Sequence, residues 1–198
     1  MRGNLESHAA EDSFTQSAKG LLILDEDNST PAHGEFRMDA GRESLSTHRS
    51  LVPSMEQSRW DDHLFLRLDP GDEIHASIQS AMTSQAETAA AVTSGIGRVR
   101  DVDVGYLGED GIYQRVVIEG PVELLSMQGN VANLDGKPFT HLHIVVSDND
   151  HMVHGGHLFS ATVHVVGEFH LRIFPEGNGA PMTRCHIEGS EFKPLSFE

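Results

Sequence analysis

The sequence predicts an α+β fold in which an antiparallel β-sheet packs against one main helix. One segment, from residue 74, has apolar residues at helical spacing, whereas most later segments alternate apolar and polar residues as half-buried strands do. Turn sequences rich in Gly, Asp and Pro separate the strands, which is typical of antiparallel hairpins. One helix among many such strands predicts a sheet with the helix covering one face.

The first elements follow residue 62. Leu64, Leu66 and Leu68 share one face of a predicted strand at 63–68, and an Asp-Pro-Gly-Asp turn follows. Asp72 is the expected N-cap of the helix.

The helix is expected to run from residue 74 toward about Val92, because an Ala-rich stretch follows its apolar positions. Gly95 and Gly97 would end it. The remaining segments are predicted as strands, which are 102–106, 112–118, 122–127, 140–147, 152–154 and 158–174.

These patterns divide the 198 residues into three parts. Residues 1–60 read as an N-terminal arm, partly disordered or with one short strand at 21–24; residues 61–174 form the domain; residues 175–198 read as a C-terminal loop tail. The single cysteine, Cys185, allows no internal disulfide. Because no apolar run is long enough for a membrane span or a signal peptide, we expect a cytoplasmic protein without a membrane partner.

The charge argues against DNA binding by this chain alone. The formal net charge is −16, and residues 61–174 carry sixteen acidic against six basic side chains. Nucleic-acid binders normally present a basic patch, since neutralising phosphates supplies most of their affinity. A DNA-associated role would therefore depend on partners.

Seven of the thirteen histidines lie within residues 141–170, and three of them predict a metal site. His141 and His143 point the same way on a strand, because side chains alternate with period two. Gly155-Gly156 would let the backbone approach closely and aim His157 toward them. Three neutral imidazoles with an open fourth position suit catalytic zinc, and also nickel, copper or iron. Because imidazole must be neutral to ligate, binding should weaken as the pH falls through about 6.5.

The alternative is that a His-x-His pair is only an exposed polar face, or that these histidines hydrogen-bond one another beneath a subunit contact. His75, on the helix, is expected at the surface. Two acidic residues, Glu123 and Glu168, are candidates for supporting the ligands or for acid/base chemistry, although solvent exposure is the simpler reading of Glu123.

Six motifs resemble the PPC (plants and prokaryotes conserved) domain, and their order and spacing span nearly all of residues 61–174. They are Leu66–Ile74, Ser94–Gly97, Glu119–Met127, Asp135–Pro138, His141-Leu142-His143 and Gly155-Gly156-His157-Leu158. The resemblance implies an antiparallel sheet with a packed helix, assembled as a homotrimer, and it points to metal binding by the same three histidines. Plant members carry an AT-hook that binds DNA. This chain lacks the hook, because its only Arg-Gly, Arg2-Gly3, is followed by Asn4.

The sequence therefore predicts a homotrimeric PPC-like domain that holds a divalent metal, zinc first, through His141, His143 and His157. Two alternatives stay open. One is a DNA-associated regulatory protein that acts through partners. The other is a metal-dependent enzyme that binds a small molecule at a subunit interface.

Overall fold

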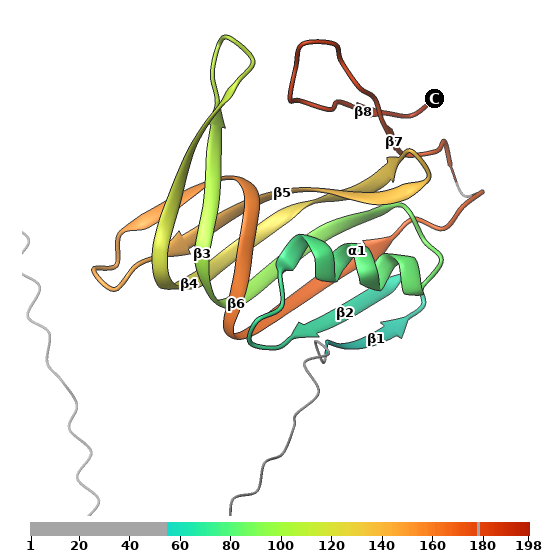
Figure 1. Ribbon diagram of the computed structural model, residues 1–198. Helices are drawn as coiled ribbons and strands as arrows, with labels where there is room; N and C mark the ends of the chain where they lie inside the picture. The colour runs from blue at the N-terminus through green and yellow to red at the C-terminus, as the bar shows by residue number, and fades with distance from the viewer. Residues whose placement is uncertain (1–54, 178) are drawn as a thin grey trace, which may run out of the picture. The chain divides into compact units, whose positions relative to one another are not determined.

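The computed structural model describes residues 55–177 and 179–198, and the short strand predicted at 21–24 lies outside them. Within these described residues the chain forms eight strands and one helix, which Figure 1 labels. They are β1 (Glu56–Trp60), β2 (His63–Leu68), α1 (Ile74–Ser84), β3 (Ala90–Leu107), β4 (Tyr113–Leu134), β5 (Lys137–Ser147), β6 (Val153–Ile173), β7 (Thr183–Arg184) and β8 (Leu195–Ser196). The α+β class with an antiparallel sheet and one helix is confirmed, and β1 lies within the segment assigned to the N-terminal arm.

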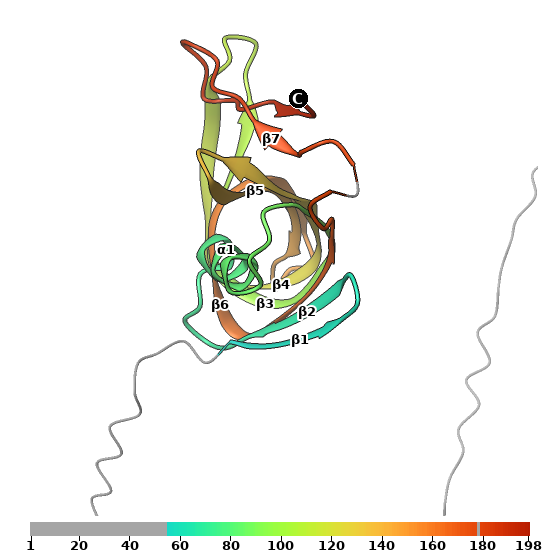
Figure 2. The ribbon, with the colours of Figure 1, turned by 90° about the vertical axis from the view of Figure 1, so that its right-hand side faces the viewer.

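The four long strands close on themselves. β6 pairs with β3, β3 with β4, β4 with β5, and β5 again with β6, all antiparallel. Figure 2 looks along this ring of strands. The β1–β2 hairpin extends the sheet from the C-terminal half of β6, where His63 pairs with Arg172 and Leu68 with Gly167. Strands β5 and β6, which carry the three predicted ligands, are therefore direct neighbours.

Helix α1 packs against β2, β5 and β6. Its inner face buries Ile74, Ile78, Ala81 and Met82, at the spacing that the sequence predicts. These side chains join a continuous apolar core with residues of β2 to β6, including the fully buried Phe169, Leu142 and Leu158. The helix thereby fixes the inner side of β5 and β6 next to the histidines. Within the described residues, no helix has the length and apolarity that crossing a membrane would require.

The helix begins at Ile74, as predicted, but its N-cap is not the predicted Asp72. Its N-cap is Glu73, whose Oε2 accepts a hydrogen bond from the backbone N–H of Ala76 at 2.7 Å. Asp72 instead belongs to the preceding turn, where its buried carboxylate accepts the backbone N–H of Asp69 at 2.8 Å. The prediction of Asp72 as the N-cap was wrong because the side chain of Asp72 is hydrogen-bonded within the turn instead of to the helix.

The helix also ends at Ser84, well before Val92. Ala90 and Val92 lie in β3, paired with β4 on one side and β6 on the other, so sheet pairing overrides the helix propensity of the Ala-rich stretch. Gly95 does not end a helix, because it too lies in β3. A Cβ at this position would come within 2.6 Å of the Phe169 ring, so the glycine makes room for a core side chain.

The C-terminal residues, predicted as a loop tail, add two short strands to the sheet. β7 pairs with β4 in parallel, through Thr183 and Asn133, and β8 pairs with β7. Both views place this segment beside β5 (Figures 1 and 2). It therefore lies next to the strand that carries His141 and His143.

Candidate metal centre

Two neighbouring strands bring the three predicted histidines together. His141 and His143 occupy alternate positions of β5, and His157 lies on β6 directly opposite His143 in the register. The ring centroids are 5.0–5.4 Å apart in all three pairs. One ligand nitrogen from each ring lies within 4.8 Å of the other two, and no further His, Cys, Asp or Glu of the described residues joins them. The arrangement is a three-nitrogen cluster.

Glycines bring the strands close at this point. A Cβ on Gly155 would come within 2.6 Å of the Ile144 carbonyl oxygen, and one on Gly156 within 2.9 Å of the Gly105 carbonyl oxygen. Gly129 of β4 lies closer still, since its Cβ would be 2.0 Å from the carbonyl oxygen of His141 itself. The predicted close approach at Gly155-Gly156 is thus present, and Gly129 extends it to the third strand.

The surroundings keep two of the histidines neutral. Burial, followed by the positive charge of Arg184 and the neighbouring histidines, lowers the pKa of His141 to about 4. Burial, followed by the other histidines and Arg184, lowers the pKa of His157 to about 4. Neutral imidazole has a free lone pair, so both rings are in the form that binds a metal at physiological pH.

The hydrogen bonds of the cluster suit a metal ligand set. The buried Nδ1 of His157 has no hydrogen-bond partner. An unpaired buried nitrogen lowers the stability of the fold unless a ligand binds it. His143 is exposed, and its position at the rim leaves it accessible. With three imidazoles, the donor set is one that zinc, nickel, copper or iron accepts. The residues present therefore fit a divalent transition metal.

His141 also contacts a cation. Arg184 Nη2 lies 3.2 Å from His141 Nδ1, and a guanidinium can only donate, so Nδ1 accepts and Nε2 carries the ring proton. A neutral ring that ligates through Nε2 must carry its proton on Nδ1, which then no longer accepts from Arg184. Ligation through Nδ1 displaces Arg184 directly. Either way, metal ligation by His141 breaks the contact with Arg184.

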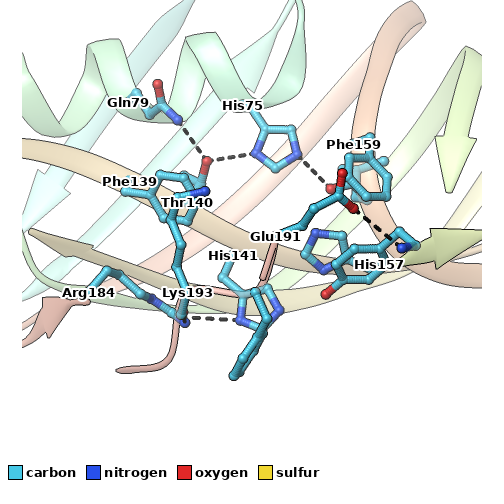
Figure 3. A pocket seen from close by; sticks show the side chains of 13 residues that line it. His75, Gln79, Phe139, Thr140, His141, His157, Phe159, Arg184, Glu191 and Lys193 are labelled. Atoms are coloured by element: carbon cyan, nitrogen blue, oxygen red, sulfur yellow. Dashed lines mark hydrogen bonds between the residues drawn. The ribbon is translucent and has the colours of Figure 1, made fainter. Parts of the chain in front are cut away.

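A cavity of about 320 Å³ opens beside the cluster, with His141 and His157 in its wall (Figure 3). Aromatic rings form much of the remaining wall, and Tyr113 stacks on His157 with the ring centroids 4.7 Å apart. The C-terminal segment contributes the rest of the lining, namely Arg184, Glu191, Phe192 and Lys193. A small molecule in this cavity would lie against two of the three candidate ligands.

His75 also lines the cavity, so its predicted surface position was wrong. Its Nε2 lies 3.1 Å from the Leu158 carbonyl oxygen, which can only accept, and its Nδ1 lies 2.6 Å from Thr140 Oγ1. His75 therefore donates through Nε2 and accepts through Nδ1. Burial lowers its pKa, which keeps the ring neutral. With both nitrogens bonded, His75 supports the strands around the cluster and has no free lone pair for a metal.

Neither predicted carboxylate reaches the cavity. Glu123 is exposed and forms an ion pair with Arg98 at 2.8 Å, because the two face each other across β3 and β4. Glu168 is an exposed residue of β6 opposite Arg67 of β2. The alternation of side chains along a strand predicts which face of the sheet each residue lies on, but not how far along the sheet it lies. The sequence alone therefore could not show that Glu123 and Glu168 lie away from the histidines.

Three further histidines have hydrogen-bond partners outside the cluster. His154 Nε2 bonds the carboxylate of Asp148 at 2.8 Å, and this bond lowers the pKa of Asp148. His63 and His170 bond each other at 2.8 Å across β2 and β6. None of them joins the three-nitrogen cluster.

The model of the Plants and Prokaryotes Conserved (PCC) domain, the family written PPC above, matches residues 55–175. No curated protein matches the sequence.

Solved structures share the fold. A metal-containing protein from Archaeoglobus fulgidus is 32% identical, with a TM-score of 0.59, over 73% of this chain and 98% of that one. A plant- and prokaryote-conserved protein from Pyrococcus horikoshii is 26% identical, with a TM-score of 0.58, over 68% and 90%. A suggested DNA-binding protein from Bacteroides thetaiotaomicron is 18% identical, with a TM-score of 0.65, over 72% and 97%, and this likeness shows the fold alone. The family match covers more than half of the sequence, so this chain belongs to the Plants and Prokaryotes Conserved domain family.

Proposed function

We propose that this protein binds one divalent metal ion per chain through His141, His143 and His157, with zinc as the first candidate. The observation that carries the proposal is the convergence of three imidazole nitrogens within 4.8 Å. The similarity to a metal-containing protein supports it. A zinc ion held by three imidazoles offers a Lewis-acidic position with one open coordination site.

The chain's own residues prepare the site. His141 and His157 present neutral rings, and aromatic side chains line the cavity beside them. The absence of a thiolate ligand in this set favours moderate affinity that a chelator overcomes. Elemental analysis of protein purified without chelator tests the proposal. We expect close to one equivalent of a divalent transition metal per chain, and protein free of metal that also takes none up on titration would contradict it.

We propose further that the protein is a homotrimer. The edge strand β1 is exposed along its whole length, and an open edge is normally paired or covered. His143 is exposed, and so are the apolar Val145, Met152 and Val153 around the β5–β6 turn, which suits cover by a neighbouring subunit. Light scattering should give about three times 21.7 kDa. A monomeric mass over a wide concentration range would contradict the trimer.

The charges of the described residues do not favour direct DNA binding. Six exposed or half-exposed arginines are each engaged with a carboxylate, namely Arg59, Arg67, Arg98, Arg100, Arg115 and Arg172. Of the other three cations, Arg184 is buried, Lys193 lines the cavity, and Lys137 is an isolated exposed position at the start of β5. Because phosphate binding needs free cations on one face, a role near DNA would require a partner.

A further inference from the structure

The cavity beside the histidines contains a buried cation without a counterion. Arg184 is only 7% exposed. Its guanidinium donates to the Lys193 carbonyl oxygen at 2.7 Å, to Asn130 Oδ1 and to His141 Nδ1, all of them neutral groups. Its buried Nε has no hydrogen-bond partner. No carboxylate of the described residues lies within ion-pair distance of it.

Such an arrangement is costly in the absence of an anion. A buried charge is normally paired, because the loss of hydration is otherwise uncompensated. Lys193 adds a second cation to the same wall, with its Nζ 5.5 Å from the centre of the Phe139 ring. The one carboxylate in the lining, Glu191, is exposed and accepts the backbone N–H of Tyr113 at 3.3 Å. The charges on this wall therefore favour a bound anion.

The remaining wall is largely apolar and aromatic, with His75, Gln79 and Thr140 as its polar members. Phe139, Phe159 and Leu158 face the cavity, as does the ring of Tyr113 (Figure 3 labels both phenylalanines). A volume of about 320 Å³ is at the lower end of the range for small-molecule sites. This shape and chemistry suit a compact molecule with one anionic end and an apolar body.

We propose that the cavity binds a small organic carboxylate, whose charged group is held by Arg184 and Lys193 and whose apolar body lies among the aromatic rings. A planar carboxylate matches the fork of N–H donors on a guanidinium. This inference rests on the proposed metal site in one respect: ligation by His141 frees an Arg184 N–H for the ligand. Arg184 and Lys193 lie beyond residues 55–175, so the specificity comes from a segment outside the family match.

Benzoate and its neutral analogue benzamide test the proposal by calorimetry, on the full-length protein loaded with Co²⁺ and on the metal-free protein. We expect benzoate to bind and benzamide to bind at least about tenfold more weakly, because only the anion satisfies the buried cation. Arg184→Met should weaken benzoate binding about tenfold or more, and Arg184→Lys should weaken it less. Lys193→Met should weaken it severalfold, whereas Lys137→Met, at the exposed first position of β5 and outside the cavity lining, should leave it unchanged.

The outcomes separate this inference from the metal proposal. Equal binding of benzoate and benzamide overturns the carboxylate site, and so does benzoate binding that is unaffected by both Arg184→Met and Lys193→Met. Lys193→Met keeps the test valid if Arg184→Met does not fold. If the protein takes up no cobalt, the metal proposal fails, and the titration of the metal-free protein then decides this inference alone. Benzoate binding that depends on Arg184 supports it, and no benzoate binding overturns it.

Discussion

Arg184 Nη2 lies 3.2 Å from Nδ1 of His141, so a cation from the C-terminal segment contacts one of the three histidines of the candidate metal centre. The contact fixes the proton of the metal-free ring on Nε2, and it places a positive charge beside the cluster. A metal ion bound as proposed would therefore compete with the guanidinium for His141. The same competition makes Arg184 available to a ligand once the ring is ligated.

Replacing Arg184 with methionine should raise the affinity for metal. The substitution removes both the competing donor at His141 and an unfavourable charge near the ion. We expect a severalfold lower dissociation constant for Zn²⁺, measured by competition with a chelating indicator, with Arg98→Met as the control at an exposed arginine. Weaker metal binding in a well-folded Arg184→Met protein would mean that Arg184 supports the site instead.

The low pKa values predict how many protons metal binding releases. At pH 6, three histidines of ordinary pKa, about 6.5, would together release about two protons. His141 and His157, with pKa values of about 4, are already deprotonated at this pH, so at most one proton should be released from the three rings. Calorimetry in buffers of different ionisation enthalpy counts these protons. Release of two or more would show that the cluster is not held neutral.

This result would revise the pH dependence predicted from the sequence. For these two rings, protons compete with the metal only as the pH falls toward about 4, rather than through 6.5. The alternation of β5 identifies the ligands, but the burial that lowers their pKa values comes from long-range packing.

Gly129 should be indispensable for the local geometry. A Cβ at this position would be 2.0 Å from the carbonyl oxygen of His141, so Gly129→Ala must push β4 and β5 apart. We expect a loss of about 1–3 kcal/mol in the free energy of unfolding, measured with urea, together with weaker metal binding. Gly179→Ala, where a Cβ meets nothing within 4 Å, is the matched control. Unchanged stability and affinity in Gly129→Ala would show that β4 does not constrain His141.

The convergence of the three histidines was predictable from the sequence, and the wall of the cavity was not. His141 and His143 follow from the period of two in a strand, and Gly155-Gly156 marks the close approach that positions His157. Arg184 lies in a segment without periodicity, and its role depends on contacts with residues more than forty positions away. Local patterns do not contain that information. The helix, too, was predicted too long, because Ala90 owes its strand conformation to pairing with β4 and β6.

Titration with Co²⁺ followed by visible absorption tests the central claim most directly, because the intensity of the spectrum reports both stoichiometry and a tetrahedral ligand field. The account predicts one equivalent per chain for the wild-type protein at pH 7.5. It predicts no stoichiometric binding for His143→Ala, an exposed position whose loss leaves the core intact, and full binding for His164→Ala, an exposed histidine outside the cluster. A wild-type protein that takes up no cobalt, or a His143→Ala protein that still binds one equivalent, would contradict the three-histidine metal site.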